Sequence, residues 1–332
     1  MSSRRKNGFR RTHEFWLLLV IVLLCVVLST ATRGFLTMRN FLDLLTTNAV
    51  VGIFGAGLLV VLISGGIDIS FTATASVAQY LALTFANKYG FGWAGVFVIV
   101  VLTGVVVGAF NGFIIYRFKV NSTIVSIGTL NLLFGLLMWI SNGSYISNLP
   151  DWFLKGVDWF DVTTASGDTF YVNLQIVLLV LSFVMTWILL YHTNIGRQIF
   201  ALGGNPEGAQ RLAFNVWKLH LIVYVYMGVM AGLASVAQAQ LAQSVIPASL
   251  VGKELDVVAA VVLGGASLLG GSGSVVGTML GLALLAVMQN GLTVMGVSSY
   301  WLQFFVGLVI VWAVTLTAME ARRTGMLGRV RA

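Results

Sequence analysis

Few side chains in this sequence are able to do chemistry, and a carboxylate inside the apolar stretches is the first of them. Asp68 is the only carboxylate between Asp43 and Asp151, and two glycines precede it. A charge at membrane depth is costly unless a cavity or a partner receives it. The glycines, followed by Ser70 and Thr72, predict a helix break of the kind that lines solute pathways. Two interpretations of Asp68 stay open: a pathway or gating residue, and a cap at the cytoplasmic surface for the next helix.

Two further acidic residues, Glu254 and Asp256, stand at the start of a later apolar segment. Acidic residues suit the first turn of a helix, so capping is the favoured interpretation. Alternate residues do not share a helix face, which argues against a paired acid–base site. Isolated amides inside apolar runs are candidates for interhelical hydrogen bonds or for solute contacts. The candidate pathway residues are Asp68, Ser70, Thr72, Gln79, Asn111, Asn131, Glu254, Asp256 and Asn290.

Residues 192–218 form a polar island between two apolar runs. Its centre, residues 203–208 (GGNPEG), is a turn signal. Residues 207–213 are predicted to form one short helix, with Asn205 as its cap and Pro206 at its first position. A capped helix between two membrane spans is exposed to a partner outside the membrane.

The elements that must position these residues are membrane helices. Of the 332 residues 58% are apolar and 9% are charged, with a mean hydropathy of +0.94, whereas soluble domains carry roughly 25% charged residues. The sequence predicts an all-α integral membrane protein of about ten transmembrane segments, some of them broken or re-entrant. Spans are predicted near 15–28, 43–64, 70–85, 93–116, 123–140, 171–191, 219–238, 274–293 and 299–318, with a shorter segment at 257–269.

The 37 glycines exceed what soluble helices tolerate, and in membrane helices glycine lets backbones approach closely. Gly273, Gly277 and Gly281 recur every fourth residue and predict helix packing.

A single transmembrane domain, residues 15–318, is expected between a basic cytoplasmic arm (1–14) and a basic cytoplasmic tail (319–332). The apolar run at 15–28 also fits a signal peptide, but an uncleaved first span is favoured because many spans follow. Residues 141–170 form an outward-facing loop with interleaved acidic and aromatic residues. Trp152, Phe153, Trp159 and Phe160 in this loop suit a headgroup-level interface.

The net charge of +8 is distributed by loop, which does not suggest a nucleic-acid partner. Fourteen of the 19 Lys and Arg residues fall on one predicted side, a positive-inside pattern that places both termini in the cytoplasm. The one cysteine, Cys25, excludes an intramolecular disulfide.

Motifs of catalysis are missing from the sequence. There is no G-x-x-x-x-G-K-[S/T] phosphate loop and no G-x-S-x-G elbow. His13, His192 and His220 have no ligand spacing to a carboxylate or to Cys25, so no metal site is predicted. We therefore expect neither an enzyme nor a cofactor bound by this chain.

Several motifs, in order, give the chain a family resemblance. They are GGIDIS (65–70), GR (196–197), ALGGN (201–205), ELDVVAAVVLGG (254–265), GGSG (270–273), NGL (290–292) and GVSSY (296–300). This series resembles the permease subunits of ribose-type ABC sugar importers, and the similarity covers nearly the whole chain from the second span onward.

The resemblance implies a bacterial inner-membrane permease that works as a pair, of identical or homologous chains. A cytoplasmic ATPase with fused nucleotide-binding halves would carry ATP and Mg, and a periplasmic binding protein would deliver the sugar. Residues 141–170 would then be periplasmic, and 192–218 would be the segment that couples to the ATPase. The implied coupling residues are Gly203, Gly204, Asn205, Pro206, Glu207, Ala209 and Arg211.

The sequence departs from the family pattern after Ser70, where Phe71 stands in place of a small residue. An aromatic there is expected to narrow or reshape the pathway, which leaves pentoses, hexoses, furanoses, sugar alcohols and autoinducer-like molecules open as substrates. Two other classes of function stay open. One is a stand-alone secondary transporter coupled to an ion through Asp68, Glu254 or Asp256, and the other is a receptor or scaffold.

Overall fold

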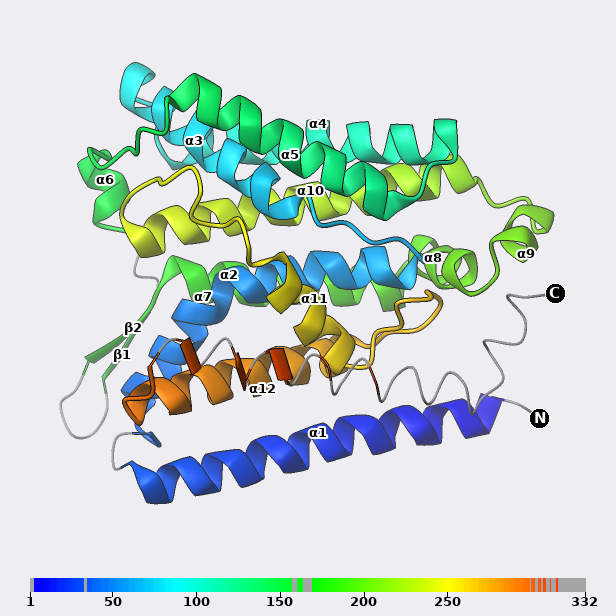
Figure 1. Ribbon diagram of the computed structural model, residues 1–332, viewed down its shortest axis with the longest axis horizontal. Helices are drawn as coiled ribbons and strands as arrows, with labels where there is room; N and C mark the ends of the chain where they lie inside the picture. Colours follow the sequence, from blue (N-terminus) through cyan, green and yellow to red (C-terminus); the bar gives the residue numbers. More distant parts are fainter. Residues whose placement is uncertain are drawn as a thin grey trace.

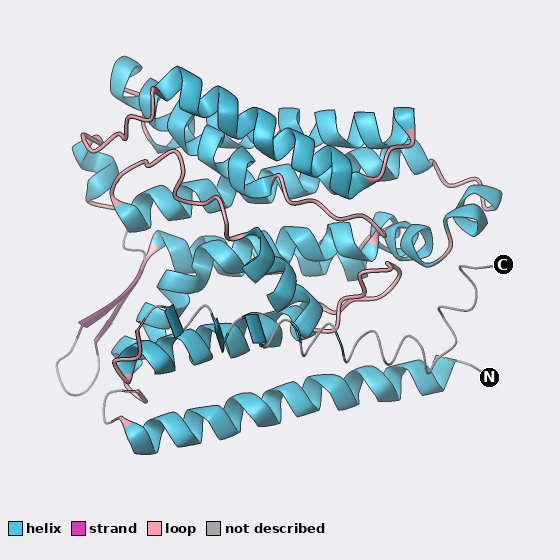
Figure 2. Cartoon of the chain, in the orientation of Figure 1, coloured by secondary structure: helices cyan, strands magenta, loops and turns pink. Residues whose placement is uncertain are grey.

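The computed structural model describes residues 3–32, 35–156, 160–163, 169–298 and single residues between 300 and 315. Within this part, helices dominate and the strands form one antiparallel hairpin (Figure 2). The elements are α1 (Ser3–Ala31), α2 (Met38–Ile63), α3 (Phe71–Tyr89), α4 (Trp93–Phe118), α5 (Ser122–Ser141), α6 (Asp151–Leu154), β1 (Phe160–Thr163), β2 (Thr169–Val172), α7 (Leu174–Trp187), the π-helical turn η1 (Ile188–His192), α8 (Asn194–Gly204), α9 (Pro206–Arg211), α10 (Val216–Ala242), α11 (Glu254–Leu263) and α12 (Val275–Val294).

Helices α2 and α10 form the centre of the molecule. Helices α3, α4 and α5 lie on one side of this pair, and α12 and α1 lie on the other (Figure 1). In the most apolar stretch of α2, 78% of the residues are buried, against 17% in α1. Helix α2 is therefore the core, whereas α1 presents most of its apolar surface outward, as a lipid-facing helix does.

Glycine makes the crossing of α4 and α10 possible. A Cβ atom on Gly104 would lie 2.0 Å from the carbonyl oxygen of Gly228, and one on Gly228 would lie 1.9 Å from the oxygen of Gly104. Gly108 approaches the Tyr224 carbonyl in the same way, at 2.2 Å. These contacts join backbone to backbone, so close approach rather than flexibility explains the glycines of these helices.

Among the described residues, seven helical stretches are long and apolar enough to cross a membrane. They are His13–Ala31, Met38–Ile63, Trp93–Phe118, Ser122–Ser141, Leu174–His192, Val216–Ala242 and Val275–Val294. The prediction of an all-α membrane protein is confirmed, apart from the small hairpin. The count of about ten segments stays a prediction, since much of 299–318 lies outside the described residues.

Two further helices, one more polar and one shorter than these stretches, pack against them. Helix α3 has 19 residues but carries polar side chains along a buried face, which lowers its hydropathy. Helix α11 has 10 residues and is about 15 Å long at 1.5 Å per residue, half of a hydrocarbon core of roughly 30 Å. Its length agrees with the expectation that the segment starting near residue 257 is short for a membrane span.

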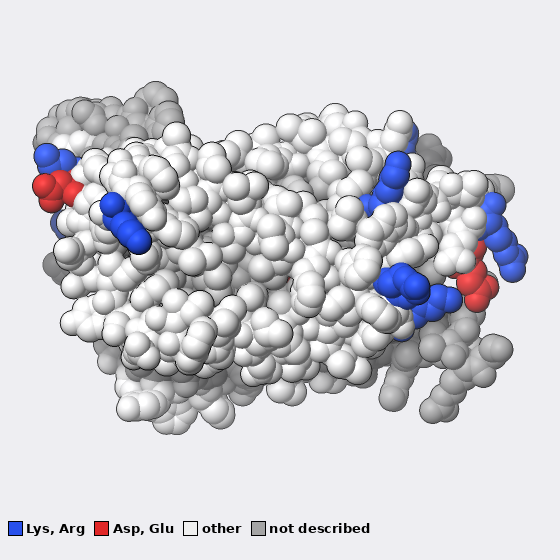
Figure 3. All heavy atoms as spheres, turned by 90° about the horizontal axis from the view of Figure 1, so that it is seen from above, with Lys and Arg blue, Asp and Glu red and all other residues white. Residues whose placement is uncertain are grey.

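Charged side chains gather at the two ends of the molecule. On the face shown in Figure 3, the middle is almost entirely free of Lys, Arg, Asp and Glu. Helix α6 and the hairpin lie at one end of the long axis, and α8 and α9 lie at the other (Figure 1). The uncharged middle is the surface that a bilayer requires.

The loop predicted at 141–170 contains α6 and the hairpin, in which Phe160 pairs with Val172 and Thr163 with Thr169. Phe153 is fully buried, its ring centroid 5.0 Å from that of Trp93, and Trp152 meets the same ring edge-on at 5.3 Å. Phe153 therefore belongs to the core. The expectation that it lies at a headgroup interface is wrong. Trp159 lies outside the described residues.

The predicted basic arm forms the first turns of α1 from Ser3 onward. Farther along α1, His13 Nε2 lies 3.0 Å from the Leu263 carbonyl oxygen, and Ser274 Oγ donates to Glu14 Oε1 at 2.5 Å. These contacts fasten α1 to α11 and to the start of α12.

Candidate functional site

The break between α2 and α3 carries a buried carboxylate. The Asp68 side chain is 2% exposed, and its Oδ1 accepts hydrogen bonds from Ser70 N at 2.8 Å and from Ser70 Oγ at 2.7 Å. These bonds form a turn at Ser70, the N-cap residue of α3, but no side chain caps an N–H group within that helix, so the capping interpretation of Asp68 is not met. The burial also shows that Asp68 is not on the protein surface.

The hydrogen bonds of Asp68 continue into two further helices. Asn111 Nδ2 on α4 donates to Ser70 Oγ at 2.9 Å, and Thr129 Oγ1 on α5 donates to Asn111 Oδ1 at 2.7 Å. All these side chains are at most 4% exposed. Such a connected buried network fixes one arrangement of its helices, because breaking any link leaves a buried polar group unpaired.

The start of α5 is joined to the same break. Ile67 N donates to Ser122 Oγ at 3.0 Å. A Cβ atom on Gly66 would lie 2.4 Å from the Tyr224 hydroxyl oxygen, so Gly66 admits the α10 side chain against the break. The segment between α2 and α3 is thus held by α4, α5 and α10.

Glu254 is the first residue of α11, and its side chain bonds to groups outside that helix. Its side chain is 8% exposed, its Oε2 accepts from Gly252 N at 2.8 Å, and its Oε1 accepts from Thr72 Oγ1. The link between Thr72 and Glu254 joins the start of α3 to the start of α11. The two residues lie far apart in the sequence, so the sequence alone does not reveal their contact. Asp256 is half-buried on a different face of α11.

A face of α3 carries polar groups without partners. Thr72, Ser76 and Gln79 recur at helical spacing and are at most 1% exposed. Ser76 Oγ and both amide atoms of Gln79 have no hydrogen-bond partner within the described part of the chain. We call Thr72, Ser76 and Gln79 the polar stripe. Buried unpaired polar groups are costly unless water or a solute satisfies them, so the stripe is a candidate binding surface.

Ser76 was absent from the predicted set, although its spacing from Thr72 and Gln79 was visible in the sequence. Two further members of the predicted set, Asn131 and Asn290, belong neither to the stripe nor to the hydrogen-bond network of Asp68. Asn131 is exposed on α5 and donates to the Ile127 carbonyl oxygen at 2.9 Å. Asn290 exchanges two hydrogen bonds with Asn40, at 3.0 and 3.1 Å, at the start of α2.

Phe71 does not point along the stripe. Its ring is 1% exposed and lies 4.7 Å, centroid to centroid, from that of Phe54 on α2. The residue that departs from the family pattern therefore packs α3 onto the core helix.

The polar island contains two helices, α8 and α9, where one was expected. Asn205 separates them in an extended conformation and its Oδ1 accepts from Gly208 N at 2.9 Å, with Pro206 at the first position of α9. The predicted cap is confirmed, although α9 ends at Arg211. Ala209 is buried, whereas Glu207 and Arg211 are exposed and available to a partner.

Gly203 and Gly204 end α8 and do not form the turn that the sequence suggested. Gly271 N donates to the Ile63 carbonyl oxygen at 2.9 Å, and a Cβ atom on Gly203 would lie 1.9 Å from that oxygen. Gly65, with φ of +87°, packs beside them against Gly270. We call Ile63, Gly65, Gly203, Gly270 and Gly271 the glycine junction. It joins α8 by backbone contact to the break that holds Asp68.

The predicted glycine stripe of α12 lies at close backbone contacts. A Cβ atom on Gly277 would lie 2.1 Å from the Gly264 carbonyl oxygen, and one on Gly281 would lie 2.1 Å from that of Ala260. Gly273 precedes α12 and meets the Ile63 side chain. Within the described residues no group of three or more His, Cys, Asp or Glu is placed to hold a metal ion.

Comparison with known proteins decides the family. The model of the family described as "Branched-chain amino acid transport system / permease component" matches residues 40–314. The chain belongs to this family. Within it, the chain is 33% identical over 327 residues to the ribose import permease protein RbsC of Escherichia coli (strain K12), covering 95% of this chain and 98% of that protein.

Other relatives of the permease family extend the comparison. RbsC of Bacillus subtilis (strain 168) is 32% identical, over 89% of this chain and 90% of its own length. The autoinducer 2 import system permease protein LsrC of Yersinia pestis (strain Pestoides F) is 29% identical, over 88% and 81%. The prediction of a ribose-type ABC sugar permease in the inner membrane is confirmed. As a permease, the chain is a transport subunit and not itself an enzyme.

Proposed function

We propose that this permease forms the solute pathway of an ATP-driven importer for a monosaccharide or a related polyol. The polar stripe carries the proposal, because a hydroxyl and an amide buried without partners match the hydroxyl groups of a neutral sugar. The relatives named for ribose and autoinducer 2 import support this solute class.

The proposed pathway lies among α3, α10 and α11. Thr72, bonded to Glu254, stands at one end of the polar stripe, and Gln79 lies two turns farther along α3. Asp68, Ser70 and Asn111 support the start of α3 through their network. In this proposal Asp68 positions the stripe and does not itself bind solute.

The proposal includes the orientation of the chain. The bias of Lys and Arg supports a cytoplasmic location for α8, α9 and both termini, with α6 and the hairpin facing the periplasm. About ten transmembrane segments would then include α3, α11 and the segment at 299–318. The chain would pair with a second permease chain, identical or homologous, within the bilayer.

Coupling to ATP hydrolysis is assigned to α8 and α9. A cytoplasmic ATPase with fused nucleotide-binding halves would bind ATP and Mg and press on residues 203–211, and a periplasmic binding protein would deliver the sugar. The exposed Glu207 and Arg211 on α9 offer charged contacts, and the glycine junction carries a displacement of α8 to the break between α2 and α3.

Uptake into vesicles tests the proposed function. We expect uptake of a neutral sugar or polyol only when the permease is reconstituted with its ATPase, ATP and binding protein. The alternative, an ion-coupled secondary transporter, draws support from the buried Asp68 and Glu254. Solute accumulation by the purified chain alone, driven by an ion gradient, would establish that alternative and exclude the importer.

Replacing both Glu207 and Arg211 with Ala is expected to lower permease-stimulated ATPase activity at least about tenfold, since charge pairs across an interface contribute strongly to association. Ala at Arg117, an exposed cation in the last turn of α4 and outside residues 192–218, is the matched control. Membrane insertion is checked by the yield of monodisperse protein. Full stimulation by the double variant would remove α9 from the ATPase interface.

A further inference from the structure

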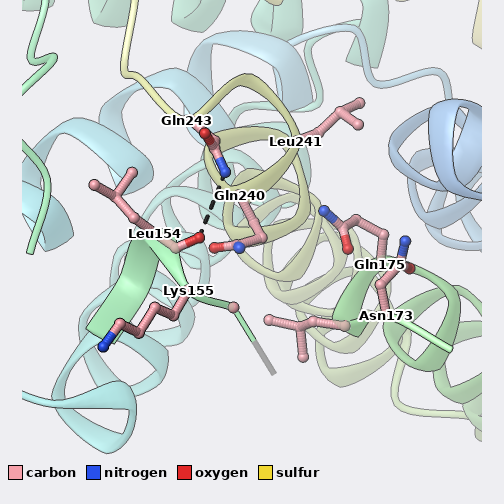
Figure 4. Close-up of a pocket in the computed structure, with 9 residues that line it drawn as sticks. Leu154, Lys155, Asn173, Gln175, Gln240, Leu241 and Gln243 are labelled. Atoms are coloured by element: carbon pink, nitrogen blue, oxygen red, sulfur yellow. Dashed lines mark hydrogen bonds between the residues drawn. The ribbon is translucent and has the colours of Figure 1, made fainter. Parts of the chain in front are cut away.

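A hollow of about 220 Å³ opens at the end of the molecule opposite α8 and α9. Three separate segments line it: the residues that follow α6, the start of α7 and the last turn of α10 (Figure 4). Its lining is rich in amides, with Asn173, Gln175, Gln240 and Gln243, and includes Lys155. The four amides come from two segments that lie far apart in the sequence.

Two of the four amides are already committed to the fold. Asn173 donates to Thr46 Oγ1 at 2.8 Å and accepts from Ile176 N, whereas Gln243 donates to the Leu154 carbonyl oxygen at 3.4 Å. In Gln175 and Gln240, by contrast, Oε1 is buried and has no partner within the described residues. The Gln175 side chain as a whole is 5% exposed. Both oxygens therefore lack a donor, and each belongs to an amide side chain that lines the hollow.

The chemistry of the lining selects the donor. Hydroxyl groups of a neutral solute can donate to the amide oxygens and accept from the amide N–H groups, whereas an anionic group has no proton to donate to the two unpaired oxygens. A cation would meet the Lys155 ammonium group, since no acidic residue occurs among the described residues that line the hollow. The volume lies below the roughly 300 Å³ at which pockets for larger small molecules begin. A neutral polyhydroxylated solute of monosaccharide size fits these conditions.

We propose that this hollow is an outward-facing subsite for a neutral monosaccharide or alditol, with Gln175 and Gln240 as its hydroxyl acceptors. That the bound solute is the transported one rests on the proposed function. The subsite is separate from the polar stripe, because its residues come from α7, α10 and the segment after α6. A solute released at this end would be held there before it enters the pathway.

Protection of a single cysteine from a maleimide tests the subsite. Leu241 lines the hollow and is 37% exposed, so Leu241→Cys in a Cys25→Ser background places the probe there. Ile246→Cys, 48% exposed and outside the lining, is the matched control. We expect millimolar neutral pentoses, hexoses or alditols, tested in turn, to slow labelling of the first cysteine about fivefold or more and to leave the second unchanged. D-ribonate, an anion of similar size, is expected to give no protection.

The combined Gln175→Leu and Gln240→Leu substitutions are expected to abolish protection while the protein keeps its Tm. Three outcomes would overturn the subsite: no protection by any neutral sugar or alditol, protection that survives in the double variant, or protection by the sugar-free binding protein alone. The first of these, with ATP-driven uptake by the wild type intact, removes the subsite and leaves the proposed function standing. Protection by sugar without any ATP-driven uptake removes the proposed function and leaves the subsite standing.

Discussion

Alanine in place of Gly203 is expected to abolish ATP-driven uptake and to lower the Tm of the purified permease by several degrees. The added Cβ would lie 1.9 Å from the Ile63 carbonyl oxygen and 2.6 Å from Gly271 N, two atoms that are hydrogen-bonded to each other. Backbone atoms cannot turn aside as a side chain does. We expect a cost at or above the roughly 1–3 kcal/mol typical of overpacked sites.

Gly204→Ala is the matched control for this variant. The nearest atom to a Cβ on Gly204 is the Gly271 Cα, at 3.8 Å, which is an ordinary contact. Both glycines lie in the last turn of α8, where alanine favours the helix by up to about 1 kcal/mol. The difference between the two variants therefore isolates the contact with Ile63. Equal Tm and equal uptake in both variants would show that α8 does not depend on the glycine junction.

Leucine in place of Gln79 is expected to reduce uptake at least about tenfold and to leave Tm unchanged or higher. Gln79 is 1% exposed and neither amide atom has a partner among the described residues. Replacing an unpaired buried amide with an apolar group of similar size removes a desolvation penalty of about 1–3 kcal/mol, so the fold does not suffer. A solute that depends on the amide loses its contact. Stability and transport should thus move in different directions.

Asn131→Leu is the control for the Gln79 experiment, since it removes an amide from an exposed position on α5 outside the polar stripe. Uptake and Tm are measured on the same preparations of both variants. Wild-type uptake by Gln79→Leu would remove the stripe from the pathway. A large fall in Tm would instead assign Gln79 a structural role.

Much of the architecture was predictable because apolar runs and turn residues determine membrane helices directly. The spans predicted at 93–116 and 274–293 agree closely with α4 and α12, where Gly92 and Ser274 precede the runs. The cap at Asn205 was predictable for a similar reason, since capping depends on neighbours within one turn.

Contacts between distant segments were not predictable in this way. Gly203 and Gly204 suggested a turn, because a sequence does not distinguish a glycine needed for its φ from one needed for its missing side chain. The bond between Thr72 and Glu254 and the chain from Asp68 to Thr129 depend on how whole helices dock. A lone serine inside a membrane helix usually bonds to its own backbone, so the sequence alone does not indicate that Ser76 is unpaired.

Helix α11 is joined at its start to the polar stripe, which is proposed to contact solute, and after its end to the glycine junction, which is proposed to couple to the ATPase. At its start Glu254 bonds to Thr72 of the polar stripe, and the loop after its end reaches Ile63 through Gly271. In the proposed importer, this helix would couple solute binding thermodynamically to ATPase binding. If binding of the ATPase changes the affinity of the permease for solute by some factor, binding of solute must change its affinity for the ATPase by the same factor. An occupied pathway would then report its own state across the membrane to the cytoplasmic face.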